Sequence, residues 1–213
     1  MKLTYLLAPA LIALAACAEP EAAPAPETQP DPQETATAPA EAEAPHAPTI
    51  TQLGGDLPTP FPGHDMATLI GPDDTAASVA FIEFVVPAKS PAAPPHTHAD
   101  EDEYFLVLEG ELTFLNGDET ITAGPGTLAA MTRGNRHAFW NNSDAPARGL
   151  LAVAPGDFAS FFDQVVMEIR AQNAADPAAI GGIVAAEAAK HNVIVDMSQL
   201  PPELAALMGP PPQ

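Results

Sequence analysis

The sequence predicts an all-β core followed by a helical C-terminal extension. Between residues 67 and 153, short runs rich in Val, Ile, Phe, Leu and Thr alternate with clusters of Gly, Pro, Asn and Asp. Many short strands joined by such turns are typical of a sandwich or barrel. After Gly156 the apolar residues take helical spacing instead. The roughly 160 residues after residue 48 are enough for one hydrophobic core, but not for two domains of ordinary size.

The candidate strands are short, apolar and bounded by turn residues. Glu109-Gly110 and Asn116-Gly117-Asp118 are favourable hairpin turns, because glycine adopts the positive φ that such turns require. The strands predicted on this basis are 67–70, 78–86, 104–108, 111–115, 120–122, 127–132, 137–141 and 148–153.

Helices are expected over 157–170, about 177–190 and 201–208. Asp157 is the predicted N-cap of the first helix, and Asp176 is that of the second, with Pro177 at its first position. The simplest arrangement is a helical lid that packs on the β core.

Three histidines and one glutamate are spaced so that they could converge on one metal ion. His96 and His98 are two residues apart, so on a strand both rings point to the same face. Glu103 opens one apolar run and His137 opens another. Imidazole and carboxylate ligands suit iron, copper, nickel, zinc and manganese. We therefore expect one divalent transition metal, of unknown identity, bound by His96, His98, Glu103 and His137.

The residues around these ligands resemble the two motifs of the cupin superfamily. Gly110 completes the first motif, and Ser90 stands where its first glycine is expected. In the second motif Thr132 replaces a proline, whereas the remaining positions match, namely Gly126, Gly134, His137 and Asn141. The resemblance covers about residues 60–155 and implies a double-stranded β-helix, or jelly-roll, barrel. The helical ending is similar to that of quercetin dioxygenase-like single-domain cupins. The predicted domains are accordingly a barrel over 49–155 and a helical extension over 156–213.

Side-chain alternation suggests which residues line a substrate pocket. If Glu103 and His137 point inward, so do Phe105 on the first strand, and Phe139 and Asn141 on the second, while Ala138 and Trp140 point outward. Together with Met131, the inward residues are candidate pocket residues, namely Phe105, Met131, Phe139 and Asn141. The alternative is that they are ordinary core side chains. The other histidines, His46, His64 and His191, are expected to be solvent-facing or structural.

The N-terminal segment resembles a bacterial lipoprotein signal. Lys2 precedes an apolar run over residues 3–13, which is followed by Leu14-Ala15-Ala16-Cys17. The resemblance implies a signal peptide over 1–16 and lipidation of Cys17, the only cysteine in the chain. An ordinary cleaved signal is the alternative. Residues 17–48, rich in Ala, Pro and Glu, are expected to form a disordered linker. These features predict a lipid-anchored protein of the cell envelope that faces the periplasm, most simply at the outer membrane.

The charge excludes one class of partner. A formal net charge of -21 repels the phosphates of nucleic acids. The expected partner is a small-molecule ligand or substrate, and the membrane is contacted only through the lipid anchor. The resemblance is also compatible with a homodimer, because cupin barrels often pair through sheet edges.

Three functions remain open at this point. The first is a metal-dependent dioxygenase that acts on a small aromatic or flavonol-like substrate, in which the resemblance suggests Glu103 as the catalytic base. The second is a non-catalytic periplasmic cupin that binds a small molecule or a sugar. The third is a cupin isomerase or decarboxylase, which usually needs a further acid–base group in the pocket. The sequence does not identify the substrate.

Overall fold

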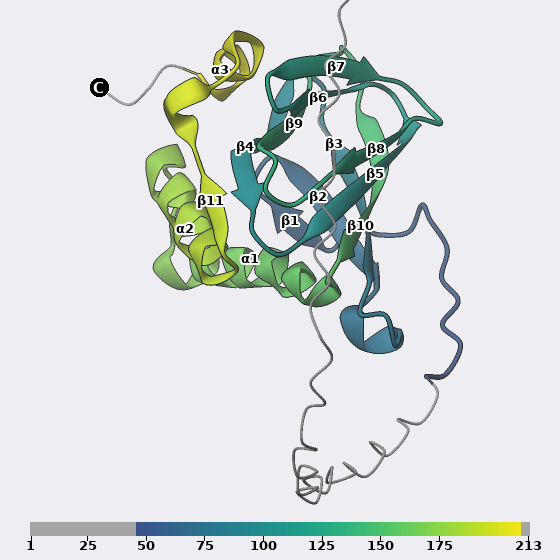
Figure 1. The fold of residues 1–213 in the computed structure, drawn as a ribbon. Coiled ribbons are helices and arrows are strands. Elements are labelled where there is room, and N and C mark those ends of the chain that lie inside the picture. Colours follow the sequence, from purple (N-terminus) through teal and green to yellow (C-terminus); the bar gives the residue numbers. More distant parts are fainter. Residues whose placement is uncertain (1–45, 210–213) are drawn as a thin grey trace, which may run out of the picture. The chain divides into compact units, whose positions relative to one another are not determined.

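A computed structural model of the protein describes residues 46–209 (Figure 1). The predicted signal peptide, Cys17 and most of the predicted linker lie outside the described residues. Residues 46–48, the end of that linker, are exposed and have no regular structure. No helix within residues 46–209 combines the length and the hydrophobicity needed to cross a membrane.

The core consists of two antiparallel sheets. Their strands follow the orders β1-β2-β3-β10-β5-β8 and β11-β4-β9-β6-β7. The bounds of the first sheet are β1 Thr59–Phe61, β2 His64–Ile70, β3 Ala80–Val86, β10 Ala147–Ala154, β5 Asp102–Glu109 and β8 Leu128–Met131. Those of the second are β11 Val193–Val195, β4 Ser90–His98, β9 His137–Asn141, β6 Leu112–Asn116 and β7 Glu119–Ala123. The predicted jelly-roll core is therefore confirmed, as a sandwich whose sheets are not hydrogen-bonded into a closed barrel within residues 46–209.

Every predicted strand corresponds to an observed one, but β1, β4 and β11 were not predicted as strands. β4 reads Ser-Pro-Ala-Ala-Pro-Pro-His-Thr-His. Proline and alanine are depleted in strands, and proline cannot donate to the ladder, so local propensity argues against a strand here. The pairing of β4 with β9 shows the consequence, because its register shifts around Ala93. The surrounding sheet imposes the extended conformation on a segment that does not favour it.

The motif glycine at position 110 has a clear structural role. Gly110 has a φ of +71°, and a Cβ atom there would lie 2.5 Å from the carbonyl oxygen of Pro146. Both the backbone conformation and the space therefore require glycine. The two motif departures do not disturb the fold nearby: Ser90 begins β4, where its hydroxyl donates to the carbonyl oxygen of Gly63, and Thr132 follows β8 directly.

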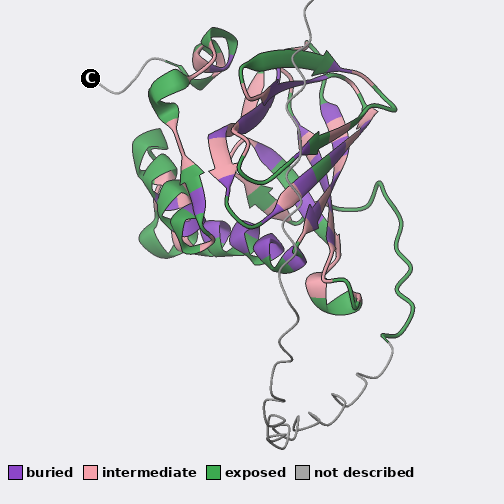
Figure 2. Ribbon diagram, in the orientation of Figure 1, coloured by how far each residue is buried: buried purple, intermediate pink, exposed green. Residues whose placement is uncertain are grey.

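Aromatic rings fill the space between the sheets. Buried residues gather on the strands (Figure 2). The rings of Phe105, Phe114 and Phe139 lie 5.0–6.1 Å apart by centroid, and Phe84 lies 5.5 Å from Phe139. Gly149 on β10 faces the ring of Phe84, which occupies the space that a side chain at 149 would need. The inward direction predicted for Phe105 and Phe139 agrees with this core.

The opposite face of β9 is covered by the last helix. Ala138 and Trp140 form a separate buried cluster with Leu115 and Leu204, and Leu204 belongs to α3, Pro202–Met208. The sequence predicted these two β9 side chains to point outward. They do lie on the other face from Phe139, but α3 shields them from solvent.

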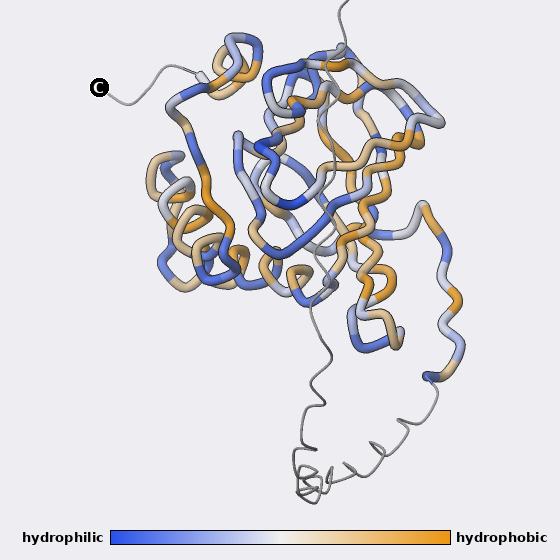
Figure 3. The backbone as a smooth tube through the Cα atoms, in the orientation of Figure 1, coloured by the Kyte–Doolittle hydropathy of each residue, from blue (hydrophilic) through white to orange (hydrophobic). Residues whose placement is uncertain are grey.

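The C-terminal extension folds back onto the sheets. It begins with a short 3-10 helix, Gly156–Ala159, and continues through α1, Ser160–Gln172, and α2, Pro177–Lys190. α1 packs against β1 and α2, and α2 packs against β11, a hydrophobic segment that pairs with β4 (Figure 3). Two further 3-10 turns occupy Pro72–Asp74 and Met197–Gln199. The extension thus contributes a strand to the sheet as well as helices.

One predicted helix cap is confirmed and one is wrong. The carboxylate of Asp176 accepts hydrogen bonds from the backbone N–H groups of Ala178 and Ala179, as expected for an N-cap. Asp157 does not cap α1, because the 3-10 turn delays the start of that helix to Ser160. Its side chain accepts a hydrogen bond from the hydroxyl of Ser78 instead.

Candidate metal centre

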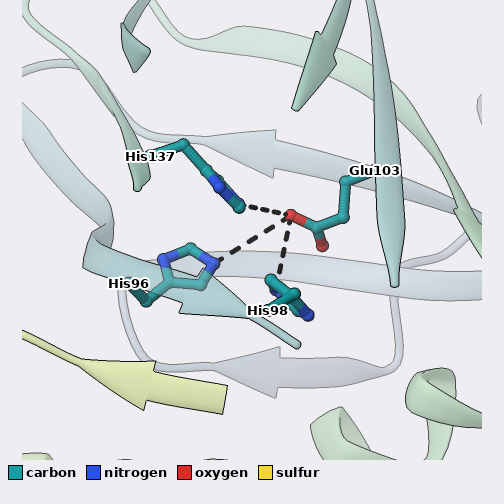
Figure 4. Close-up of side chains that lie close together, drawn as sticks. All are labelled: His96, His98, Glu103 and His137. Carbon is teal, nitrogen blue, oxygen red and sulfur yellow. Dashed lines mark hydrogen bonds and ion pairs between the residues drawn. The ribbon is translucent and has the colours of Figure 1, made fainter. Parts of the chain in front are cut away.

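The four predicted ligands come together at one place between the two sheets. β4 ends with His96 and His98, β9 begins with His137, and the register pairs His96 with His137 across these strands. Glu103 enters from β5 in the other sheet. One ligand atom from each residue lies within 4.8 Å of the others, and all four residues form the group here called the ligand cluster (Figure 4).

One carboxylate oxygen of Glu103 forms the centre of the ligand cluster. Its Oε2 atom lies 3.0 Å from Nε2 of His137, 3.7 Å from Nε2 of His98 and 4.0 Å from Nε2 of His96. Figure 4 shows this oxygen directed at the three rings, while the second oxygen points away from them. The four donor atoms therefore face a common point, which is the arrangement that a single metal ion requires.

Hydrogen bonds to the other ring nitrogens orient the imidazoles. Nδ1 of His96 lies 2.8 Å from the carbonyl oxygen of Pro94, and Nδ1 of His137 lies 3.0 Å from that of Asn135. A carbonyl oxygen only accepts, so each Nδ1 carries a hydrogen and donates it. In the neutral rings, the lone pair is therefore on Nε2, which faces the other ligands.

Glu101 provides the corresponding support for His98, and sequence reasoning missed it. Its Oε2 atom lies 2.9 Å from Nδ1 of His98, and both side chains are buried. A carboxylate that accepts from a metal-binding histidine fixes the ring and makes it a stronger ligand. The sequence signal was that Glu101 follows the candidate ligand His98 by three residues. It was missed because the acidic run around Glu101 is typical of a solvent-exposed turn.

The donor set fits a divalent transition metal. Nε2 of His98 is buried and has no hydrogen-bond partner among the described residues, although a buried nitrogen normally has one. A metal ion would satisfy this atom and would be bound by His96, His98, Glu103 and His137 together. Three imidazoles and a carboxylate suit iron, manganese, nickel, copper or zinc, so the donor set does not determine the metal.

The protonation states of Glu103 and His96 suit metal binding, whereas His137 would release the Nε2 proton that it shares with Glu103 when a metal binds. Burial alone would raise the pKa of Glu103, but the hydrogen bond from His137 and the nearby imidazoles outweigh it and hold this pKa at about 2. Burial, followed by repulsion from His137, lowers the pKa of His96 to about 3. Burial opposes protonation of His137, but the bond to Glu103 outweighs it and raises the pKa of His137. Glu103 is therefore an anion and His96 a neutral donor at neutral pH.

A large apolar cavity borders the ligand cluster. Its volume is about 700 Å³, and His96 and Glu103 form part of its wall. Phe105 and Phe139, two of the predicted pocket residues, also line it. This size is typical of sites for small organic molecules.

The other two predicted pocket residues do not line the cavity. Asn141 is fully buried; its amide donates to the carbonyl oxygens of Val86 and Ala145, and its Oδ1 accepts from Ser143. These bonds hold the turn after β9, so the side chain has a structural role. Met131 is a buried core residue on β8.

His64 is a cavity residue that sequence reasoning did not identify. It was expected to be solvent-facing or structural, but it is only 5% exposed and lines the cavity. Burial lowers its pKa to about 4, so the ring is neutral at physiological pH. The predicted strand 67–70 began too late to include it, whereas β2 starts at His64 itself.

The arginines near the second motif form ion pairs with carboxylates and do not line the cavity. Arg133 forms an ion pair with Asp102, at 2.9 Å between Nη2 and Oδ2. Arg136 contacts the carboxylate of Asp118 and the carbonyl oxygen of Gln199. Among residues 46–209, no Lys or Arg side chain lines the cavity.

Comparisons with known proteins agree with this architecture. Residues 82–161 match the family model of the cupin domain. The tetracenomycin polyketide synthase protein TcmJ of Streptomyces glaucescens is 26% identical over 93 residues, which are 44% of this chain and 62% of that protein. The chain therefore matches less than two thirds of the length of this curated relative.

Two solved structures are similar to part of this chain. The polyketide cyclase RemF from Streptomyces resistomycificus is 28% identical with a TM-score of 0.39, over 44% of this chain and 68% of that one. KdgF from Halomonas sp. is 14% identical with a TM-score of 0.44, over 51% of this chain and 94% of that one.

Proposed function

Residues 82–161 are a cupin domain, and from this premise we propose that the protein is a metal-dependent dioxygenase that acts on a small aromatic or flavonol-like molecule. The observation that supports this proposal most is the position of the ligand cluster at the wall of an apolar cavity of about 700 Å³. A planar apolar substrate would fit this space and could present an oxygen atom to the metal.

The lining of the cavity favours such a substrate over sugars and small acids. Within the described part of the chain, the titratable side chains that line the cavity are His64, His96 and Glu103. A sugar phosphate or a dicarboxylate could place one anionic group on the metal, but a second charge would be buried without an ionic partner among the described residues, at a cost of several kcal/mol. The cavity therefore disfavours doubly charged substrates of an isomerase or decarboxylase.

The ligand cluster and the apolar lining of the cavity would have different roles. A divalent metal held by the ligand cluster would supply Lewis acidity and, if it is redox-active, reactivity toward dioxygen. Phe105 and Phe139 offer ring faces and edges that orient an aromatic substrate. The apolar wall excludes water, which strengthens the electrostatic interactions at the cluster.

Glu103 is the candidate base, but its neighbours lower its pKa and so weaken it as a base. Its pKa of about 2 makes it a weak base while it holds its present contacts. To take a proton from a substrate hydroxyl, it must first loosen its bond to the metal or to His137. In the variant Glu103→Gln, compared with the parent at equal metal content, we expect oxygen uptake to fall at least 100-fold. Full activity of this variant would exclude the base role.

Oxygen consumption tests the proposed activity. The purified protein is reconstituted with iron, manganese, nickel or copper and mixed with catechols and flavonols in an oxygen electrode. We expect uptake to depend on both metal and substrate, and to disappear in the double variant His96→Ala/His98→Ala. Absence of uptake with every metal, from protein that has bound the metal, would contradict the dioxygenase.

A second candidate function follows from the curated relative. TcmJ is named as a polyketide synthase protein, and a polyketide would suit the same apolar cavity. Metal-assisted cyclisation of such a molecule consumes no dioxygen, so product formation without oxygen uptake would favour this candidate. Ligand that is bound and recovered unchanged would instead favour the non-catalytic binding protein.

We also propose that the protein is anchored to the cell envelope through Cys17 and faces the periplasm. The support is the Leu14-Ala15-Ala16-Cys17 sequence after an apolar run. We expect radiolabelled palmitate to be incorporated into the parent protein and not into Cys17→Ala, which should leave the membrane fraction. Equal labelling of both proteins would contradict the anchor.

A further inference from the structure

We propose that His64 is the second polar contact of the ligand. The ligand is then a neutral, mostly apolar molecule with two oxygen functions, one for the metal and one for His64. This inference rests on the proposed function, because it assumes that the ligand binds at the ligand cluster.

His64 is a buried residue of the cavity wall. It stands at the start of β2, is 5% exposed, and lines the same cavity as His96 and Glu103. Its Nδ1 atom is buried and has no hydrogen-bond partner among residues 46–209. His64 is therefore a polar residue of the cavity wall with a ring nitrogen that no group within residues 46–209 satisfies.

The neighbours of His64 are aromatic and leave its hydrogen-bonding capacity free. Its ring lies 5.3 Å from that of Phe61, 6.0 Å from Phe84 and 5.7 Å from Phe139, measured between centroids. In these surroundings the imidazole is neutral, and a neutral imidazole has one donor and one acceptor nitrogen. A hydroxyl group can serve either nitrogen, whereas a carboxylate would be buried without a positive charge.

Phe139 connects His64 with the metal site. It follows His137 by two residues on β9, a step of about 6.8 Å along a strand. Its ring then contacts that of His64. Phe139 thus contacts His64 and stands about 6.8 Å along the strand from a metal ligand, a spacing that suits a ligand with fused or linked rings.

The energetics set His64 apart from an ordinary core residue. A buried polar atom without a partner destabilises a fold, and an apolar side chain of similar volume avoids that cost. A leucine at position 64 should therefore be at least as stable as the histidine. The histidine is explained if the atom without a partner is satisfied by a ligand.

Binding to the zinc-loaded protein tests the inference, because zinc has no redox chemistry and the probes are not turned over. The probes are quercetin, which carries oxygen functions at both ends, and catechol, which is too small to reach His64 from the metal. Both are titrated by calorimetry into the parent protein, His64→Leu, His64→Gln and the control His46→Leu, whose histidine is exposed. Metal content and Tm are measured for each.

We expect His64→Leu to bind quercetin roughly 3- to 10-fold more weakly, the effect of one lost hydrogen bond. Its catechol affinity and zinc content should be unchanged, and its Tm should be equal or about 2–4 °C higher. His64→Gln should recover part of the quercetin affinity, and His46→Leu should match the parent.

Other outcomes separate the two proposals. If His64→Leu binds quercetin as the parent does, the role of His64 is wrong and the proposed function stands. If this variant loses zinc or has a lower Tm, His64 is structural and the inference also fails. If the parent binds neither probe, the proposed function fails and the inference fails with it.

Discussion

The cavity has two walls that differ in chemistry. The wall formed by the sheets carries His64, His96 and Glu103 among aromatic rings. The wall formed after residue 156 consists only of apolar residues and glycine within the described part of the chain, contributed by α1, α2, β11 and α3 among others. The contrast indicates that the sheets hold the reactive groups, whereas the extension excludes water and sets the shape of the site.

The two walls are nevertheless joined by hydrogen bonds. β11 pairs with β4 so that Val193 lies opposite His98 and Val195 opposite His96. The strand that carries two of the metal ligands is therefore held between β9 and a strand of the extension. Variants in each wall therefore measure how far the roles of the two walls can be separated.

The largest effect is expected for a ligand of the sheet wall. The variant His98→Ala removes a buried ligand and leaves the carboxylate of Glu101 without its partner. We expect metal affinity to fall more than 100-fold, measured as metal content by mass spectrometry after dialysis. His46→Ala is the control. Unchanged metal content in His98→Ala would mean that the cluster does not bind metal as a unit.

The next effect concerns the attachment of the extension. Leu204 on α3 is fully buried against Trp140, so Leu204→Ala should lower the free energy of unfolding by about 2–5 kcal/mol. Leu128→Ala, at an exposed position on β8, should change it by less than about 0.5 kcal/mol. Urea unfolding followed by fluorescence measures both variants. Metal content should stay the same, and its loss in Leu204→Ala would show that the two walls cannot be separated.

A pH effect is expected from His64. Burial lowers the pKa of His64 from 6.5 to about 4, so the unfolded chain binds this proton more readily than the folded one. Above pH 6.5 the ring is neutral in both states, so His64 does not lower the free energy of unfolding. As the pH falls from 6.5 toward 4, the free energy of unfolding decreases by about 3 kcal/mol at most. The metal ligands titrate in this range too, so the measured quantity is the difference in unfolding free energy between parent and His64→Leu. A difference that does not vary between pH 7 and pH 4 would contradict the burial argument.

The sequence predicted which four residues come together because their signal is local. The spacing of His96 and His98, and the position of His137 at the start of a strand, are both visible in a short stretch. β4 was not predicted as a strand, because its prolines and alanines do not favour one and only its neighbours in the sheet hold it extended.

The rest of the site depends on long-range packing. His64 is far from the motifs in sequence, and it reaches the cavity only because β2 pairs with β3 next to Phe84. The sequence also did not predict that the C-terminal extension lines the cavity, because apolar spacing predicts a helix but not the surface that the helix covers. Asn141 was wrongly assigned to the pocket because alternation gives the direction of a side chain and not its hydrogen-bond partners.

The smallest effect is expected from Glu101, which contacts a metal ligand of the sheet wall and is not itself one of the four predicted ligands. Glu101 contacts His98 and not the other ligands, so it acts by holding the ring in place. In Glu101→Ala, metal affinity should fall about 10- to 100-fold, measured by competition with a chromogenic chelator. Glu101→Gln should lose less, because the amide oxygen can still accept from Nδ1. Glu109→Ala, at an exposed end of β5, is the control. Equal affinity in Glu101→Ala and the parent would show that the backbone alone positions His98. The metal ligands would then be held in place by the strands, and not by side chains such as Glu101 that bind to them.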